Sequence, residues 1–365
     1  MNNKTKLSTE PNRILSIDFF RGFTLLLLVT GIGGIFDELV KAGKGGTLIA
    51  IIHTQTGHGA WFELYFWDLI QPFFMFIVGV AMPFSVAKRL ARGDSWKKLI
   101  YHALNRSFWL LVLGFMLGAH EHAFYLTNIL PQLAFTYPIA FLLMRKDIKW
   151  QLLISFAVIV FSDVIYRYWP IEGFNQLAPD NNFGNWFDLN TVGHLNPGHW
   201  VTFNAVSTFA HVIWGTVVGK MLMKDWPHKK KLLTMLIPGL AGLMVGYSLR
   251  PYIPIIERIS TSTYVIVSGG WALIGMSISY WLIDILGFKK IPHFFAIFGM
   301  NSIFLYLFSE LGGGRIFHRM VTPFTSRLFS WIGETGIYMI DVLLVAAMFW
   351  YLSYFLYKRK IFFKL

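Results

Sequence analysis

The sequence contains no cysteine. That absence excludes disulfide bonds, cysteine-ligated iron–sulfur clusters and a thiol nucleophile. Charged residues are also scarce, at 14% of the 365 residues, against roughly 25% in an ordinary soluble domain. In their place, hydrophobic residues make up 55% of the chain and aromatic residues 18%. This composition predicts an all-α, polytopic membrane protein rather than a soluble enzyme.

Acidic residues are the scarcer charged class, with 19 Asp and Glu against 32 Lys and Arg, which gives a formal net charge of +13. An excess of positive charge also occurs in proteins that bind nucleic acid. Here, however, the basic residues fall in short runs between apolar segments, as they do in the cytoplasmic loops of membrane proteins. We therefore expect no nucleic-acid partner. Residues 1–13 are polar, so we also expect no cleavable signal peptide.

Apolar segments recur along the chain, each near the roughly 20 residues that a membrane-spanning helix needs. Placing the N-terminus in the cytoplasm puts most lysines and arginines on the inner side, including Lys229–Lys231. The sequence thus predicts about ten transmembrane helices in a single domain, residues 1–365, with both termini cytoplasmic. The predicted spans are 17–36, 64–86, 99–119, 127–144, 150–168, 200–223, 232–250, 264–287, 293–312 and 336–357.

Three outer segments, 37–63, 169–199 and 313–335, are long enough to form a cap over the outer face. The second mixes turn-forming residues with tryptophans such as Trp186, which would suit stacking against sugar rings. An interfacial aromatic belt is the alternative explanation for the tryptophans. The third segment is partly amphipathic and would lie along the membrane interface.

His58 and Asp68 stand where the first outer segment enters the second predicted span. An ionised carboxylate at the edge of a bilayer is costly, so it usually has a partner or a function. Imidazole is the side chain that takes and returns a proton near neutral pH. We therefore predict a reaction centre at His58 and Asp68. An ordinary loop histidine is the alternative.

Further polar residues lie within the predicted spans, most of them near the outer ends and Asn301 near mid-membrane. Asn204, Thr208 and His211 are spaced i, i+4, i+7, so they share one helical face that should meet a cavity or another helix rather than lipid. An interhelical hydrogen bond would explain any one of these residues, whereas several together favour a wet pocket. The residues that we assign to this pocket are Gln71, Asn128, Gln132, Asn204, His211 and Asn301.

Basic residues mark the inner side. Arg13 and Arg21 flank the start of the first span, and His102 and Arg106 lie at i and i+4 in the third. These side chains would either snorkel to lipid phosphates or clamp an anionic cytosolic ligand. The sequence has no Walker A or GxGxxG motif, so a nucleotide-binding fold is not indicated. We predict no metal site, because the His120–His122 run is better explained as an outer turn.

The segment Leu15–Gly22, LSIDFFRG, resembles the opening motif of the transmembrane acetyltransferases related to heparan-α-glucosaminide N-acetyltransferase. The resemblance is most specific in residues 58–79, which contain His58, Trp61 and Asp68. It is spread over residues 15–305, most of the chain. The remaining matching runs are Gln132–Tyr137 and Gly299–Ile303.

The resemblance implies acetyl transfer across a membrane, and the bacterial members of the family imply a bacterial inner membrane. Cytosolic acetyl-CoA would be the donor co-substrate, with no metal, and would bind at the inner basic residues. A glucosamine-type amine or an envelope glycan on the outer side would be the acceptor. His58 matches the family's catalytic histidine, and would act as a general base or as an acetylated nucleophile. Asp68 would orient it, as in a triad, and Asn128, Gln132, Asn204 or Asn301 would donate hydrogen bonds to the oxyanion.

Two places depart from the family's pattern. Phe62-Glu63 stand where the family commonly has Asn-Gly, and Thr30 stands where relatives carry Asn. The acceptor, and N- versus O-acetylation, therefore stay open, as does homodimerisation. Two other functions are also open. A secondary transporter of a small polar or sugar substrate would suit ten helices with polar midplane residues. A catalytically inactive partner in envelope-glycan assembly is the other.

Overall fold

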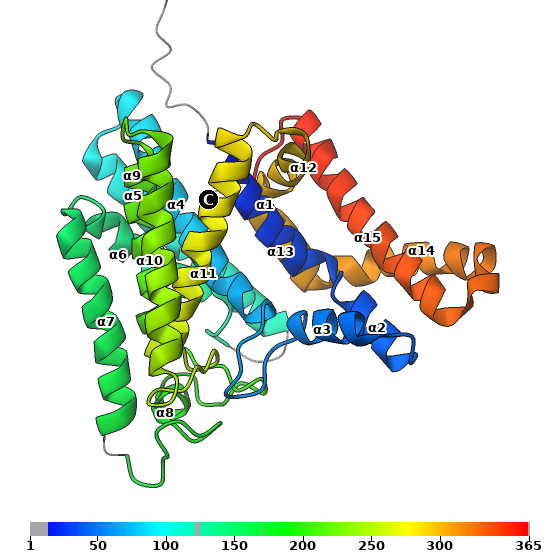
Figure 1. The fold of residues 1–365 in the computed structure, drawn as a ribbon, viewed down its shortest axis with the longest axis horizontal. Helices are drawn as coiled ribbons and strands as arrows, with labels where there is room; N and C mark the ends of the chain where they lie inside the picture. Colours follow the sequence, from blue (N-terminus) through cyan, green and yellow to red (C-terminus); the bar gives the residue numbers. More distant parts are fainter. Residues whose placement is uncertain (1–13, 121–124, 170, 364–365) are drawn as a thin grey trace, which may run out of the picture.

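The computed structural model describes residues 14–120, 125–169 and 171–363, which form helices joined by turns and loops without a β-strand (Figure 1). The predicted all-helical fold is therefore confirmed. By length and composition, seven described helices are able to cross a membrane, or up to nine if each of two bent pairs forms one span. The long helices are α4 (Ile70–Ala91), α5 (Trp96–His120), α7 (Ile148–Tyr168), α9 (Asn204–Leu222), α10 (His228–Leu249), α11 (Ser262–Tyr280) and α15 (Gly333–Lys358).

Shorter helices complete the architecture. The α-helices among them are α1 (Leu15–Thr30), α2 (Gly34–Lys41), α3 (Thr47–Gln55), α6 (Ile129–Leu143), α8 (Phe183–Thr191), α12 (Lys290–Gly299), α13 (Ser302–Phe308) and α14 (Gly314–Leu328). Single turns of other helix types are η1 (Trp67–Leu69), η2 (Trp281–Ile285), η3 (Ser309–Gly313) and η4 (Ser330–Ile332).

The predicted spans coincide with helices, but three of them are not single long helices. The first span bends by 43° between α1 and α2, after Gly31 adopts a left-handed φ of 63°. The ninth bends by 67° after α12. The fourth is α6, whose 15 residues extend roughly 22 Å, less than a hydrocarbon core of about 30 Å. These bends and this short helix explain why the structure has seven to nine candidate spans rather than ten.

Two helix pairs approach closely through glycine. A Cβ on Gly79 of α4 would lie 2.2 Å from the carbonyl oxygen of Val212 in α9. A Cβ on Gly22 of α1 would lie 1.7 Å from the carbonyl oxygen of Phe295 in α12. Both contacts need a residue without a side chain, as is common where membrane helices pack backbone to backbone. Gly22 also packs against Gly299, so the Leu15–Gly22 and Gly299–Ile303 motifs meet in space.

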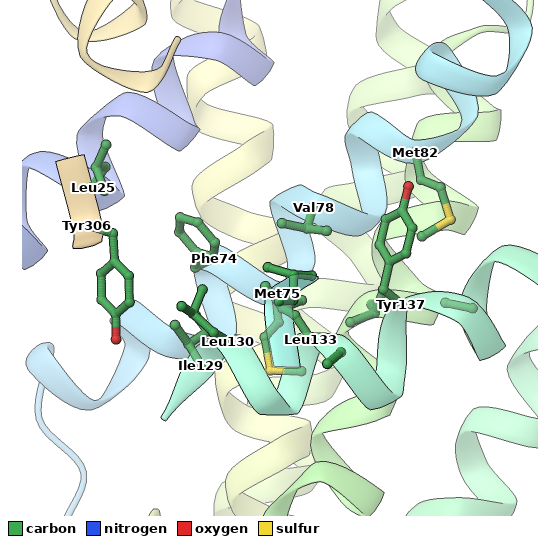
Figure 2. Close-up of a cluster of buried hydrophobic side chains, with 14 of the residues drawn as sticks. Leu25, Phe74, Met75, Val78, Met82, Ile129, Leu130, Leu133, Tyr137 and Tyr306 are labelled. Carbon is green, nitrogen blue, oxygen red and sulfur yellow. The ribbon is translucent and has the colours of Figure 1, made fainter. Parts of the chain in front are cut away.

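The largest buried apolar cluster includes side chains of α1, α4, α6 and α13. Figure 2 shows Phe74, Val78 and Met82 of α4 together with Leu133 and Tyr137 of α6. This cluster holds α4, which follows η1, against α6, which follows Asn128. It also forms much of the wall of the inner cavity described below.

Figure 1 shows the start of α1 and the end of α15 at one end of the bundle, and α2, α3 and α8 at the other. This is the arrangement that the predicted topology requires, although the side that faces the cytoplasm stays a prediction. The helix α14 runs across α15 rather than along it (Figure 1). Its exposed apolar residues Ile316, Met320 and Phe324 recur every fourth position, as in a helix that lies along a membrane interface.

Candidate functional site

The structure brings His58 and Asp68 together. His58 lies in the loop after α3, and Asp68 lies in η1, the turn that leads into α4. The Nδ1 atom of His58 is 3.0 Å from Oδ1 of Asp68. The His58 side chain is 43% exposed, whereas that of Asp68 is fully buried. Because Nδ1 faces the carboxylate, Nε2 is the ring nitrogen left for a reacting group.

Backbone amides hold Asp68 in place. The N–H of Tyr65 donates to Oδ2 of Asp68 over 2.7 Å, and the N–H of Gly59 lies 3.3 Å from each carboxylate oxygen. A Cβ on Gly59 would lie only 2.8 Å from the carbonyl oxygen of Glu63, so this tight loop needs glycine. The loop therefore wraps around the carboxylate and fixes its position relative to His58.

A second carboxylate, Glu257, faces the same imidazole nitrogen and was not among the residues predicted from the sequence. Its Oε2 atom is 3.3 Å from Nδ1 of His58, and its side chain is 4% exposed. The available signal was an acidic residue among isoleucines, between Ile256 and Ile259, in the short segment before α11. The pairing itself joins positions 199 residues apart, and no local pattern reveals such a contact.

The two carboxylates change the protonation of the site. Burial lowers the pKa of His58, but the hydrogen bonds to Asp68 and Glu257 outweigh it and raise that pKa to about 9. Burial raises the pKa of Glu257, and the negative charge of Asp68 raises it further. The hydrogen bond with His58 lowers this pKa, and the net result is a pKa of about 8. At neutral pH, His58 is thus an imidazolium and Glu257 a neutral acid. A base at His58 becomes available as the pH approaches 9.

Replacing Glu257 with glutamine should make stability less dependent on pH. The pKa of Glu257 is about 8 in the folded protein against 4.5 as its ordinary value, so the folded state binds more protons between these values. Stability from this group is complete below about pH 4.5 and is lost as the pH rises through about 8. Glutamine cannot ionise. Thermal unfolding from pH 5 to 8 should therefore decline less steeply for Glu257→Gln, and identical curves would contradict this account.

Aromatic and basic residues from distant parts of the chain lie near His58. The edge of the Trp200 ring approaches it, with centroids 5.3 Å apart, and the guanidinium of Arg258 lies 5.7 Å from the Trp200 ring. Arg258 also donates to the Gly59 carbonyl over 3.0 Å. The Nε1 atom of Trp61 donates to the carbonyl of Leu177 over 2.8 Å, which joins outer segments 37–63 and 169–199. The cap itself stays a prediction.

An outer cavity of about 440 Å³ includes His58 in its wall. Its volume falls within the roughly 300–1,000 Å³ of small-molecule sites. Polar side chains predominate among the named walls, which suits a hydroxyl-rich or amine-bearing ligand. The other lining residues are Gly33, Gly34, Asp37, His53, Thr54, Thr56, Gly57 and Tyr65.

An inner cavity of about 190 Å³ brings together Arg21 and Arg106, two of the four predicted basic residues. The Arg106 guanidinium lies 4.6 Å from the Tyr137 ring, and Arg21 pairs with Asp18 over 2.9 Å. Phe74, Val78 and other members of the cluster in Figure 2 line the rest. His102 is not in this wall, and Arg13 lies outside the described residues.

Three of the six predicted pocket residues lie in α4 or at the start of α6. The Nε2 atom of Gln71 donates to Oε1 of Gln132, and Gln132 donates to the carbonyl of Thr127 over 3.1 Å. Asn128 caps α6, because its Oδ1 accepts from the N–H of Leu130 over 3.0 Å. These contacts give each side chain an interhelical or capping role in this structure.

The other three lie elsewhere. The buried Nε2 of His211 is 2.9 Å from Oγ of Ser268, which links α9 to α11. Asn301 holds the C-terminal segment through Ile361 and Phe363, over 3.1 and 3.0 Å. Asn204 is 1% exposed, and neither its Nδ2 nor its Oδ1 has a hydrogen-bond partner among the described residues. Among the six candidates, Asn204 thus has both side-chain polar atoms unused, and His211 has its Nδ1 unused.

His58, Asp68 and Glu257 are also spaced like metal ligands, since one ligand atom of each lies within 4.8 Å of the others. A histidine with two carboxylates is a donor set that zinc accepts. Metal binding would have to displace the protons on His58 and Glu257 at neutral pH. Our expectation that the site needs no metal stays a prediction.

Comparison with known proteins supports the family resemblance over part of the chain. No family model matches this sequence. The chain is 32% identical over 112 residues to heparan-alpha-glucosaminide N-acetyltransferase of Homo sapiens. This match covers 31% of this chain and 15% of that protein. The chain is 32% identical over 106 residues to the protein of the same name from Mus musculus, covering 29% and 14%. The matched stretch is thus a small part of each relative's length.

The apolar helices and this similarity together indicate a multi-pass membrane protein. The similarity supports, modestly, a relationship to the family of these N-acetyltransferases. It does not extend to the acceptor, the donor or the role of His58.

Proposed function

We propose that this protein is a membrane acetyltransferase, which moves an acetyl group from acetyl-CoA on the inner side to an amino-sugar or glycan acceptor on the outer side. The observation that carries this proposal is the arrangement of His58. Its Nδ1 is held by Asp68 at 3.0 Å and faces Glu257 at 3.3 Å, while its ring borders the outer cavity. A histidine oriented by a buried carboxylate is suited to proton transfer at an acceptor amine.

The donor would bind from the inner side. Arg106, together with Arg21 and its partner Asp18, places positive charge at the inner cavity, which would attract the negatively charged donor. At about 190 Å³, that cavity is smaller than the roughly 300 Å³ of a typical small-molecule site. It would therefore hold only the thioester end of the donor, with the nucleotide outside.

In the base mechanism, the acceptor nitrogen attacks the acetyl carbonyl while Nε2 of neutral His58 takes the nitrogen's proton. The C–S bond then breaks, and the CoA thiolate takes that proton back, which returns His58 to its neutral form. Asp68 stabilises the transient imidazolium. The alternative, in which His58 is itself acetylated before transfer, uses the same nitrogen. Asn204 lines neither cavity, so its unpartnered amide would donate to the oxyanion only after the two cavities join.

The two cavities have no lining residue in common among the described residues. Leu28 borders the inner cavity and Gly33 the outer one, five residues further along the chain. The chain leaves the α-helix between these two residues, because α1 ends at Thr30 and Gly31 is left-handed. Transfer therefore requires the structure to open close to the 43° bend between α1 and α2.

The test is to incubate the purified protein with radiolabelled acetyl-CoA and glucosamine and to follow labelled N-acetylglucosamine. Transfer above the protein-free rate supports the proposal. Absence of transfer, together with unchanged unfolding temperature on adding acetyl-CoA, would remove it, because a bound ligand must stabilise the folded state.

Blocking the inner cavity should weaken donor binding. Ser85 of α4 borders this cavity and is exposed, so tryptophan fits there without overpacking the core. We expect Ser85→Trp to raise the KM for acetyl-CoA by about tenfold, equivalent to roughly 1.4 kcal/mol of binding, with little change in kcat. Leu90→Trp is the matched control, since Leu90 is 48% exposed on the same helix but does not line the cavity. Equal KM values for the two variants would contradict the donor site.

A secondary transporter is the second candidate, because two candidate spans are bent, by 43° and 67°. Discontinuous helices are a feature of transporter binding sites. Uptake of labelled glucosamine into proteoliposomes without acetyl-CoA would favour it. An inactive assembly partner would show neither uptake nor transfer.

A further inference from the structure

A long apolar groove lies beside the candidate site, between α1, the start of α4, α11 and α12. Its volume is about 660 Å³, within the range of ligand sites. Aromatic and branched aliphatic side chains form most of its wall. Ser279 is one polar exception, but its hydroxyl proton is already donated to the Gly275 carbonyl over 2.8 Å. The groove suits a hydrocarbon chain.

The groove follows α11 across the bundle. From Trp271 to Ile283, both in its wall, an α-helix rises roughly 18 Å, more than half of a hydrocarbon core of about 30 Å. Phe288 and Pro292 line it beyond the end of α11, and Gln55 lies at the opposite end. Ile278 and Phe288 are 49% and 62% exposed, so the groove opens towards the space where lipid would lie.

The polar end of the groove meets the reaction centre. Tyr65 lines both the groove and the outer cavity that contains His58. The N–H of Tyr65 donates to Oδ2 of Asp68 over 2.7 Å, so its position is tied to that of the catalytic pair. Gln55 is fixed next to it, because its Oε1 accepts from the N–H of Phe66 over 3.0 Å. A molecule with its chain in the groove would place its head group at His58.

We propose that the acceptor is lipid-linked: a hydrocarbon chain lies in the groove along α11, and an amine- or hydroxyl-bearing sugar head reaches His58 past Tyr65. This inference rests on the proposed acetyltransferase function and names its substrate class. A bulk membrane lipid in the same groove is the competing occupant. The two occupants differ in their effect on the rate. Only with a lipid-linked acceptor does binding of the hydrocarbon chain make acetyl transfer to the sugar head faster.

The probes are dodecyl β-glucosaminide and free glucosamine, each with labelled acetyl-CoA and the full-length protein in lipid nanodiscs. We expect kcat/KM for the dodecyl acceptor to exceed that for glucosamine by at least tenfold. Ile278→Trp should fill the groove and remove this advantage, while leaving the rate with free glucosamine unchanged. Ile278 is 49% exposed, so the change does not overpack the core.

Leu343→Trp is the matched control, because Leu343 is 52% exposed on α15 and does not line the groove. It should keep the full preference for the dodecyl acceptor. Equal kcat/KM for the two acceptors in the unmodified protein would overturn the inference and leave bulk lipid as the occupant. An equal loss of kcat/KM with both acceptors in the Ile278→Trp protein would also overturn the inference. Thermal unfolding checks that this variant is folded, and Leu282→Trp repeats the measurement. Transfer to neither acceptor overturns the proposed function itself, and this inference with it.

Discussion

Replacing His58 with alanine should lower acetyl transfer by roughly 10²–10⁴-fold, the range for loss of a general acid or base. The physical reason is that His58 borders the outer cavity and its Nδ1 is held by Asp68 at 3.0 Å, which leaves Nε2 to accept the acceptor's proton. The rate is measured as labelled product per minute under saturating acetyl-CoA. The fold should persist, because the side chain is 43% exposed.

His199→Ala is the matched control for this substitution. His199 also lies in an outer segment, its side chain is also 43% exposed, and its Nδ1 also contacts an aspartate, Asp180, at 2.6 Å. It does not line the outer cavity. Its loss should leave transfer within about twofold of the unmodified protein, as is usual for a surface change away from the site. Full activity in folded His58→Ala protein would exclude His58 from the mechanism.

Asp68→Asn should produce the second large effect, a loss of transfer of roughly 10²–10⁴-fold. Neutralising the corresponding aspartate of a serine protease triad costs about 10⁴-fold, because the histidine adopts the wrong tautomer. Here the amide keeps one oxygen for the N–H of Tyr65, but it no longer stabilises a positively charged His58. The measurement is kcat with saturating donor and acceptor, compared at equal amounts of folded protein.

The same variant makes a distinct prediction about pH. The pKa of His58 is about 9, raised by Asp68 and Glu257, so the base form and the rate should increase tenfold per pH unit up to about pH 9. Without the Asp68 charge that pKa falls, so the rate of Asp68→Asn should level off at a lower pH. Parallel profiles for the two proteins would show that Asp68 does not act on His58.

The sequence alone supported the helical class, the approximate spans and the pairing of His58 with Asp68. These depend on composition and on residues ten positions apart, which local patterns capture. Glu257 was missed because its contact with His58 spans 199 positions. The groove along α11 was missed for a related reason: α1, α11 and α12 must pack before their apolar side chains enclose it.

The predicted pocket shows a different limit. A buried polar side chain near a helix end serves a cap, a helix contact or a ligand equally well, and sequence does not distinguish these. The structure shows capping for Asn128, an interhelical bond for His211 and attachment of the C-terminal segment for Asn301. The packed structure was needed to show that Asn204 is buried and that its amide has no hydrogen-bond partner among the described residues.

Sidedness of transfer tests the central claim most directly. Proteoliposomes with the protein in one orientation would carry glucosamine inside, at the face of His58, and receive labelled acetyl-CoA outside, at the face of Arg21 and Arg106. The account predicts labelled N-acetylglucosamine in the lumen, while acetyl-CoA stays outside and His58→Ala vesicles remain unlabelled. Product formed only when donor and acceptor share one compartment would contradict transfer across the membrane.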